Sequence, residues 1–162
     1  MKLELQFNNI VDAPKCKIYI GSQELYCGIV LPRFECEYTC PDGDCQLTIQ
    51  HWDKLPSDTI VQDSKIVRDR SFELEKIIID GYDLEELVWE SEFISDDGKI
   101  YSSCLFFGPN GKFQLNFHNP VLYWILKTRH EKNHNDPTWE QDYNYYQQAC
   151  KLLTQISARS VP

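Results

Sequence analysis

The chain has 162 residues, which is enough for one domain with a hydrophobic core of its own. Its 42% hydrophobic and 13% aromatic residues exclude a disordered polymer, and its formal charge of −9 excludes nucleic-acid binding through a general basic face. The first residues, MKLELQFNNI, contain no apolar core of a secretion signal, and no run is long enough to cross a membrane. With seven cysteines, an odd number, we expect reduced thiols and a cytoplasmic location, in a host cell or in a virion.

Alternation of apolar and polar residues predicts short strands in the first part of the chain. A strand with this period buries one face and exposes the other. The pattern is clear in LELQF (3–7), CKIYI (16–20), FECEYTC (34–40) and CQLTI (45–49). Turn-forming residues separate these strands, at IGSQE (20–24), LPR (31–33) and CPDGDC (40–45).

The middle of the chain begins with a polar segment, residues 53–71, that has some β character. The next segment, FELEKIII (72–79), predicts a strand, and its continuous run of isoleucines favours burial on both faces. GYDLEEL (81–87) predicts a single helical turn, because its apolar residues continue to Val88 at helical spacing. Further on, Gly108-Pro109-Asn110-Gly111 predicts the turn of a β-hairpin.

Helical signals begin at Asn119-Pro120, which have the chemistry of an N-cap followed by the first helical residue. For residues 121–126 both helix and strand are open, and we favour helix. A later helix starts near Thr138, with one stripe formed by Trp139, Tyr143, Tyr146, Cys150, Leu153 and Ile156. We therefore predict one mainly β domain: an antiparallel, jelly-roll-like β-sandwich at 1–118 and a C-terminal helical element at 119–158.

Two groups of residues have the composition of a zinc site. His130-Glu131-Lys132-Asn133-His134 matches H-E-x-x-H, the helical motif that places two histidines beside a general base. Its charged surroundings and Pro137 favour a solvated loop instead. Cys40, Cys45 and His51 form a second combination, although cysteines on the apolar phase of a strand favour a role as small buried hydrophobes.

Acidic residues gather in the polar segment 53–71. Asp58, Asp63 and Asp69 offer hard oxygen ligands that could hold Ca²⁺, although their spacing does not match an EF-hand. In an acidic chain, solvated loop carboxylates are the more ordinary interpretation. We therefore expect no cofactor, with calcium as the alternative.

Four aromatic residues stand beside polar neighbours at predicted strand ends or loops. Exposed aromatic planes are what a sugar-binding face needs, because a pyranose ring stacks on them. The candidates for ligand binding are Trp52, Tyr82, Trp89 and Tyr101. No nucleophile elbow, phosphate-binding glycine loop or dinucleotide motif is present in the sequence, so we expect no enzymatic activity.

The segment from about residue 45 to residue 126 shares several features with a known class of module. The shared features are a His at a strand end, an Asp-rich loop, D-R-S (69–71) before I-x-I-D-G (77–81), and N-G-x-F-x-L-x-F (110–117) before a proline. With these features the chain resembles jelly-roll modules of the carbohydrate-binding type, which recur in structural proteins of tailed phages and other viruses. The resemblance implies a non-enzymatic module that binds glycans or packs in a virion.

The leading functional hypothesis is therefore a non-enzymatic binding or assembly module whose partner is a glycan or a protein. The alternative is an acidic interaction protein, such as a phage-encoded inhibitor, that blocks a basic host partner. A zinc hydrolase using His130 and His134 is the least favoured hypothesis. Self-association remains open, and we expect no membrane partner.

Overall fold

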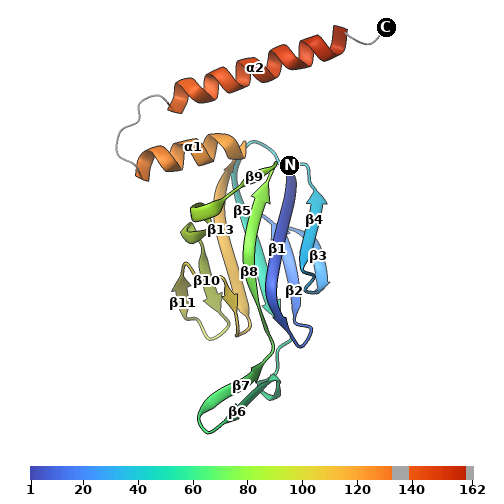
Figure 1. Ribbon diagram of the computed structural model, residues 1–162, viewed down its shortest axis with the longest axis vertical. Coiled ribbons are helices and arrows are strands. Elements are labelled where there is room, and N and C mark those ends of the chain that lie inside the picture. Colours follow the sequence, from blue (N-terminus) through green and yellow to red (C-terminus); the bar gives the residue numbers. More distant parts are fainter. Residues whose placement is uncertain (133–138, 160–162) are drawn as a thin grey trace. The chain divides into compact units, whose positions relative to one another are not determined.

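The computed structural model describes residues 1–132 and 139–159. The chain divides into two compact units, Met1–Asn119 and Pro120–Pro162. The first unit is built from strands and the second from helices (Figure 1). The change from strand to helix thus falls one residue beyond the predicted boundary at 118/119.

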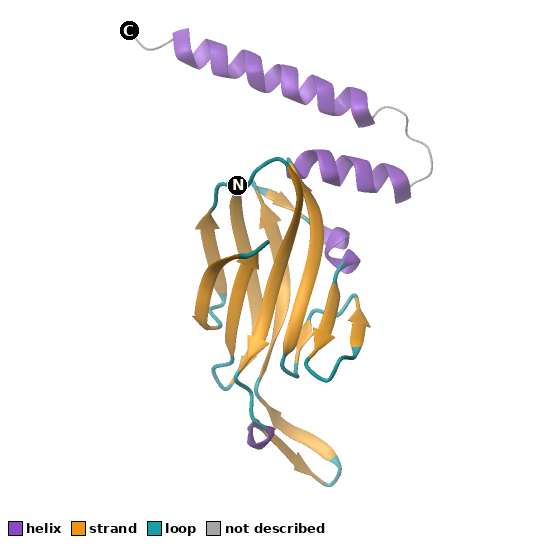
Figure 2. Cartoon of the chain, turned by 180° about the vertical axis from the view of Figure 1, so that it is seen from behind, coloured by secondary structure: helices purple, strands orange, loops and turns teal. Residues whose placement is uncertain are grey.

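Two antiparallel sheets form the body of the first unit (Figure 1, Figure 2). The first sheet contains, in spatial order, β12 (Phe106–Phe107), β8 (Ser71–Ile79), β1 (Lys2–Val11) and β4 (Arg33–Glu37), with β9 (Tyr82–Asp83) paired to β8. The second contains β11 (Ile100–Ser102), β10 (Glu92–Ser95), β13 (Gly111–Asn119), β5 (Gly43–Trp52), β2 (Lys15–Ile20) and β3 (Gln23–Ile29). The chain passes repeatedly from one sheet to the other. The prediction of an antiparallel β-sandwich is confirmed.

The core lies between the two sheets and follows the alternation in the sequence. In β1 the buried residues are Leu3, Leu5 and Phe7, and β2 and β13 alternate in the same way, whereas β5 buries Leu47, Thr48 and Ile49 in succession. Phe72 of β8 stacks on Phe107 of β12, with ring centroids 4.4 Å apart, and both side chains are fully buried. Offset aromatic pairs of this kind add about 1 kcal/mol beyond the apolar area that they bury.

Two local predictions are wrong. Gly108–Gly111 does not close a hairpin: β12 before it belongs to the first sheet and β13 after it to the second. A hairpin and a crossover between the sheets give the same alternation of apolar and polar residues. Phe107 and Phe113 are both buried in the core, although they come from opposite sheets. β8 is also not buried on both faces, since Ile78 is half-buried between the buried Ile77 and Ile79.

The predicted helical turn is confirmed as η2, a 3-10 helix at Glu85–Glu90. Leu87 and Val88 of η2 are buried, and so is Leu84, which directly precedes it. The polar segment 53–71 contains η1 (Pro56–Asp58), β6 (Thr59–Gln62) and β7 (Lys65–Asp69). β6 and β7 form a separate two-stranded sheet, which projects beyond the strands of the sandwich in Figure 1.

The second unit contains α1 (Val121–Lys132) and α2 (Trp139–Arg159), so helix is confirmed over strand at 121–126. Tyr123 and Tyr143 connect the helices, with their ring centroids 5.1 Å apart. Within the predicted stripe of α2, Tyr143 and Cys150 are half-buried and Tyr146 is exposed; the side chains of Trp139, Leu153 and Ile156 lie outside the described residues. No helix in the described part of the chain has the length and apolar character to cross a membrane.

Candidate functional site

The β6–β7 hairpin (59–69) exposes an unusual set of side chains. Ile60, Val61, Ile66 and Val67 are 40%, 57%, 64% and 55% exposed, respectively. Single exposed aliphatic residues are ordinary, but neighbouring ones on a projecting element mark a contact surface. Val61 and Ile66 lie directly opposite each other across the two strands, so these two side chains form one apolar patch.

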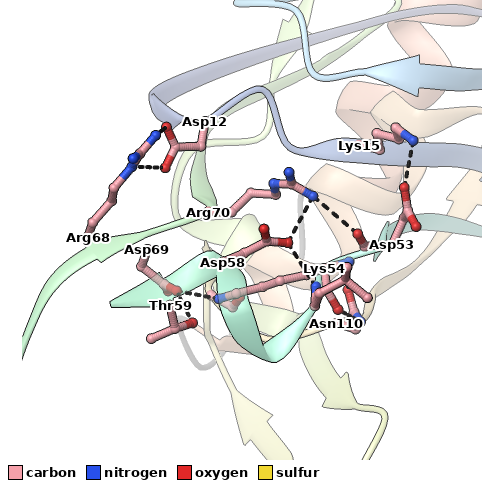
Figure 3. Close-up of polar contacts among 12 residues, drawn as sticks. Asp12, Lys15, Asp53, Lys54, Asp58, Thr59, Arg68, Asp69, Arg70 and Asn110 are labelled. Atoms are coloured by element: carbon pink, nitrogen blue, oxygen red, sulfur yellow. Dashed lines mark hydrogen bonds and ion pairs between the residues drawn. The ribbon is translucent and has the colours of Figure 1, made fainter. Parts of the chain in front are cut away.

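A polar cluster holds the base of this hairpin against the sandwich (Figure 3). The Lys54 ammonium lies 2.5 Å from Asp69 Oδ1 and also donates to the Gly108 carbonyl at 2.5 Å. Thr59 donates to the same Asp69 oxygen at 2.6 Å. The Lys54 and Asp69 side chains are only 10% and 16% exposed, so this pair is shielded from water and from salt.

Further contacts fix the chain on both sides of η1. Asn110 forms two hydrogen bonds with the backbone of Lys54: its Oδ1 accepts from the Lys54 N–H at 3.0 Å and its amide donates to the Lys54 carbonyl at 2.9 Å. Asp58 accepts from the Leu55 N–H at 2.8 Å, and the Arg70 guanidinium lies 2.9 Å from the same carboxylate. Arg70 also donates to the Asp53 carbonyl at 3.2 Å.

Two exposed ion pairs complete the attachment. Arg68 donates through two nitrogens to both carboxylate oxygens of Asp12, in the loop between β1 and β2. The hydrogen bond from Arg68 lowers the pKa of Asp12 below its ordinary value. Lys15 donates to Asp53 at 2.5 Å and likewise lowers the pKa of that carboxyl. The hairpin is therefore a fixed arm rather than a loose loop.

The predicted calcium ligands are not brought together. Asp58 bonds to Arg70, and Asp69 bonds to Lys54 and Thr59, so each carboxylate faces a cation of the protein itself. Asp63 lies in the turn between β6 and β7, at φ +50°, away from the base of the hairpin. Within residues 1–132 and 139–159, no group of three or more His, Cys, Asp or Glu side chains could hold a metal ion.

The zinc hypotheses meet different outcomes. His130 lies near the end of α1, whereas His134 lies outside the described residues, so the H-E-x-x-H hypothesis stays a prediction. Cys45 and His51 are six residues apart on the extended strand β5, a separation of about 20 Å at ~3.3 Å per residue. They cannot ligate one metal. His51 is fully buried, its Nδ1 donates to the Pro109 carbonyl at 3.0 Å, and its ring lies edge-on to Phe72.

All seven cysteines carry free thiols in the structure. The Sγ atoms of Cys40 and Cys45 lie 2.9 Å apart. Burial, followed by the hydrogen bond with Cys40, raises the pKa of Cys45 to about 12, so this thiol is protonated at neutral pH. Cys36, Cys40 and Cys45 are half-buried rather than fully buried. The loop between Cys40 and Cys45 is held by the Asn119 amide, which donates to the carbonyls of Cys40 and Pro41.

The four aromatic candidates lie in different surroundings. Trp52 is half-buried, and the ammonium groups of Lys15 and Lys17 lie 5.3 and 5.2 Å from its ring centroid, which leaves less of the ring for a sugar. Tyr82 is half-buried in β9. Trp89 and Tyr101 are 53% and 42% exposed.

Trp89 and Tyr101 belong to neighbouring segments at the β11 edge of the second sheet. Ser103, two residues after Tyr101, donates its hydroxyl to the Trp89 carbonyl at 2.7 Å and its N–H to the Ser91 carbonyl at 2.9 Å. The structure therefore brings two of the four candidates to one edge, and places Trp52 and Tyr82 elsewhere. An open pocket of about 510 Å³ lies apart from all four, lined by Met1, Lys2, Glu37, Tyr38, Thr39 and Cys40.

Sequence reasoning missed the residues that fix the hairpin, above all Lys54, Arg70 and Asn110. Their partners are 15, 12 and 56 residues away in sequence, so no local motif contains them. The one available signal was the equal number of acidic and basic residues in the polar segment. Acidic and basic residues that are interspersed along one segment are typical of ion pairs.

Comparison with protein-family models, with curated proteins and with solved structures finds no match to this chain. Function must therefore be inferred from the geometry of the chain itself. Of the sites described above, the β6–β7 hairpin combines exposed apolar side chains with a rigid attachment.

Proposed function

We propose that this protein is a non-enzymatic binding or assembly module, of the kind that packs in viral and other multi-protein structures, and that its contact surface is the β6–β7 hairpin. The observation that carries this proposal is the exposure of four β-branched aliphatic side chains on an arm fixed by the Lys54–Asp69 pair. A fixed arm loses little conformational entropy on binding, so more of the contact energy is retained.

A protein surface is the best partner for this arm. Isoleucine and valine present no aromatic plane for a sugar ring, whereas they pack well against other apolar side chains. Gln62, Asp63, Lys65 and Arg68 surround the apolar residues with polar groups. An apolar centre with a polar rim is the usual composition of a protein–protein contact.

Cross-linking at Lys65 tests the proposal. Lys65 is the lysine of the hairpin itself and is exposed, so an amine-reactive cross-linker applied to the full chain in its native extract should join it to a second polypeptide. Lys99, 67% exposed in the turn between β10 and β11, is the control and should give few intermolecular links. Intermolecular links at Lys99 but not at Lys65 would overturn the proposal.

A second candidate function is glycan binding at the β11 edge, favoured by the exposure of Trp89 and Tyr101 on adjoining segments. Stacking on exposed rings is lost when the ring is removed. Binding on a glycan array should then disappear in Trp89→Ala and Tyr101→Ala and persist in Tyr82→Phe. Unchanged binding in both alanine variants would reject this edge as a sugar site.

A further inference from the structure

Two cysteines on either side of the start of β5 lie close enough to react with each other. The Sγ atoms of Cys40 and Cys45 are 2.9 Å apart, whereas the two sulfurs of a disulfide are separated by about 2.05 Å. We infer that Cys40 and Cys45 form a reversible redox site, at which a low-molecular-weight disulfide oxidises the two thiols to an internal disulfide. This inference does not depend on the function proposed for the hairpin.

The backbone between the two cysteines keeps their sulfur atoms in contact. Gly43 lies between them at φ +127°, a conformation that side-chain-bearing residues rarely adopt, and it pairs with Asn119 of β13. The buried Asn119 amide donates to the carbonyls of Cys40 and Pro41, at 3.2 Å each. The loop is therefore fixed before any oxidation, so closure of a disulfide requires only a small movement of the two side chains.

One of the two thiols is accessible to a small reagent. Both cysteines are half-buried, but Cys40 also lines the open pocket of about 510 Å³, together with Tyr38 and Thr39. Cys45 is not among the residues that line this pocket. Burial raises the pKa of the Cys45 thiol to about 12, so Cys45 keeps its proton at neutral pH. Cys40 is therefore the thiol that attacks first, and Cys45 is the thiol that closes the bond.

The reaction proceeds in two exchange steps. In the first step, Cys40 gives up its proton and attacks one sulfur of the small disulfide, which forms a mixed disulfide and releases one small thiol that takes up the proton. In the second step, Cys45 gives up its proton and attacks the Cys40 sulfur, which forms the internal disulfide and releases the second small thiol with that proton. The two protein thiols are oxidised, and the small disulfide is reduced to two thiols.

The size and exposure of the loop favour a labile bond over a structural one. The disulfide closes a ring of only six residues, from Cys40 to Cys45. A short ring removes little entropy from the unfolded chain, so it stabilises the fold less than a long ring does. Disulfides that are partly exposed are also the ones that reductants reach. An excess of a reduced thiol should therefore restore both cysteines.

Peptide mapping after oxidation tests the inference. The reduced full chain is incubated with oxidised glutathione at neutral pH and quenched with acid, and its remaining thiols are alkylated after unfolding. Cleavage after Glu37 and Lys54 then leaves Cys40 and Cys45 on one peptide, residues 38–54, that contains no other cysteine. This peptide should carry no alkyl group and should be lighter than its reduced form by two hydrogen atoms, and dithiothreitol should reverse the change.

Three variants separate the roles of the cysteines. Cys45→Ser should stop at the first step, so that glutathione stays attached to Cys40. Cys40→Ser should leave Cys45 available to the alkylating reagent. Cys36→Ser is the matched control, because Cys36 is also half-buried and precedes the same loop, and it should form the internal disulfide like the unmodified chain.

A comparison with the unfolded chain shows whether the fold brings the sulfurs together. In one glutathione buffer, the ratio of oxidised to reduced peptide 38–54 should be at least about tenfold higher for the folded chain than for the chain in urea, because the fold holds the two sulfurs in contact.

Four outcomes would overturn the inference. The first is a peptide 38–54 that keeps both alkyl groups after treatment of the folded chain. The second is an oxidised-to-reduced ratio in the folded chain that is no higher than in urea. The third is Cys45→Ser without glutathione on Cys40. The fourth is loss of the internal disulfide in Cys36→Ser, which would assign the reaction to a different pair of cysteines.

Discussion

The strand β8 and the hairpin β6–β7 are adjacent in sequence and both contain β-branched apolar residues. β8 buries such residues in the core, whereas the hairpin exposes them. Ile77 and Ile79 of β8 are fully buried between two sheets, whereas Ile66 and Val67 of β7 are more than half exposed. The body is stabilised by apolar burial and the arm by ion pairs at its base. Isoleucine content alone therefore does not tell a core strand from a contact surface.

Truncation of a core aromatic should have the largest effect. Phe72→Ala removes a ring that packs against Phe7, His51 and Phe107, and it should lower the free energy of unfolding by about 3–5 kcal/mol. Ile66→Ala removes an exposed side chain and should change the free energy of unfolding by less than about 0.5 kcal/mol. Urea denaturation measures both. Equal losses would show that the hairpin belongs to the core.

Removal of the Asp69 carboxylate from the base of the hairpin should have the next largest effect on stability. Asp69→Ala leaves the shielded Lys54 ammonium without its carboxylate, which should cost about 2–3 kcal/mol. The double variant Lys54→Met/Asp69→Leu should be less destabilised than Asp69→Ala, because no charge then remains unpaired. A double variant more destabilised than Asp69→Ala would contradict a buried-charge penalty.

Acid should weaken the body through His51. Burial lowers the pKa of this His below 6.5, so the unfolded chain binds its proton at a higher pH than the folded chain does. The contribution of His51 to stability is therefore complete above about pH 6.5 and decreases as the pH falls below it.

Thermal unfolding between pH 7 and pH 5 measures this effect. His51→Asn, whose amide can donate to the same Pro109 carbonyl, should reduce the pH dependence. His118→Asn, a half-exposed position in β13, should keep it. A pH dependence that is unchanged in His51→Asn would assign it to other groups.

The smallest effect is expected at the exposed Arg68–Asp12 pair. Arg68→Gln should lower the free energy of unfolding far less than Asp69→Ala does, because exposed pairs are screened by water and salt. The loss should shrink further at high salt. A cost as large as that of Asp69→Ala would show that Arg68, rather than the Lys54–Asp69 pair, fixes the arm.

The sequence predicted the layers of the body because burial there follows a local period of two, as in Leu3-Glu4-Leu5. It could not distinguish a hairpin from a crossover at Gly108–Gly111, since both give the same inward side chains. For the candidate site it indicated the right segment, 53–71, and the wrong chemistry. Carboxylates that looked like calcium ligands are bonded to Lys54 and Arg70, and those contacts depend on the folded chain.

Amide hydrogen exchange tests the central contrast between body and arm most directly. In dilute solution, peptides from β8 should exchange slowly, because their amides lie in a buried sheet, and peptides covering residues 59–67 should exchange much faster, because one two-stranded sheet in water protects them poorly. Equally slow exchange in both regions of the dilute chain would mean that the hairpin is covered by the protein itself, and would contradict its assignment as an exposed contact surface.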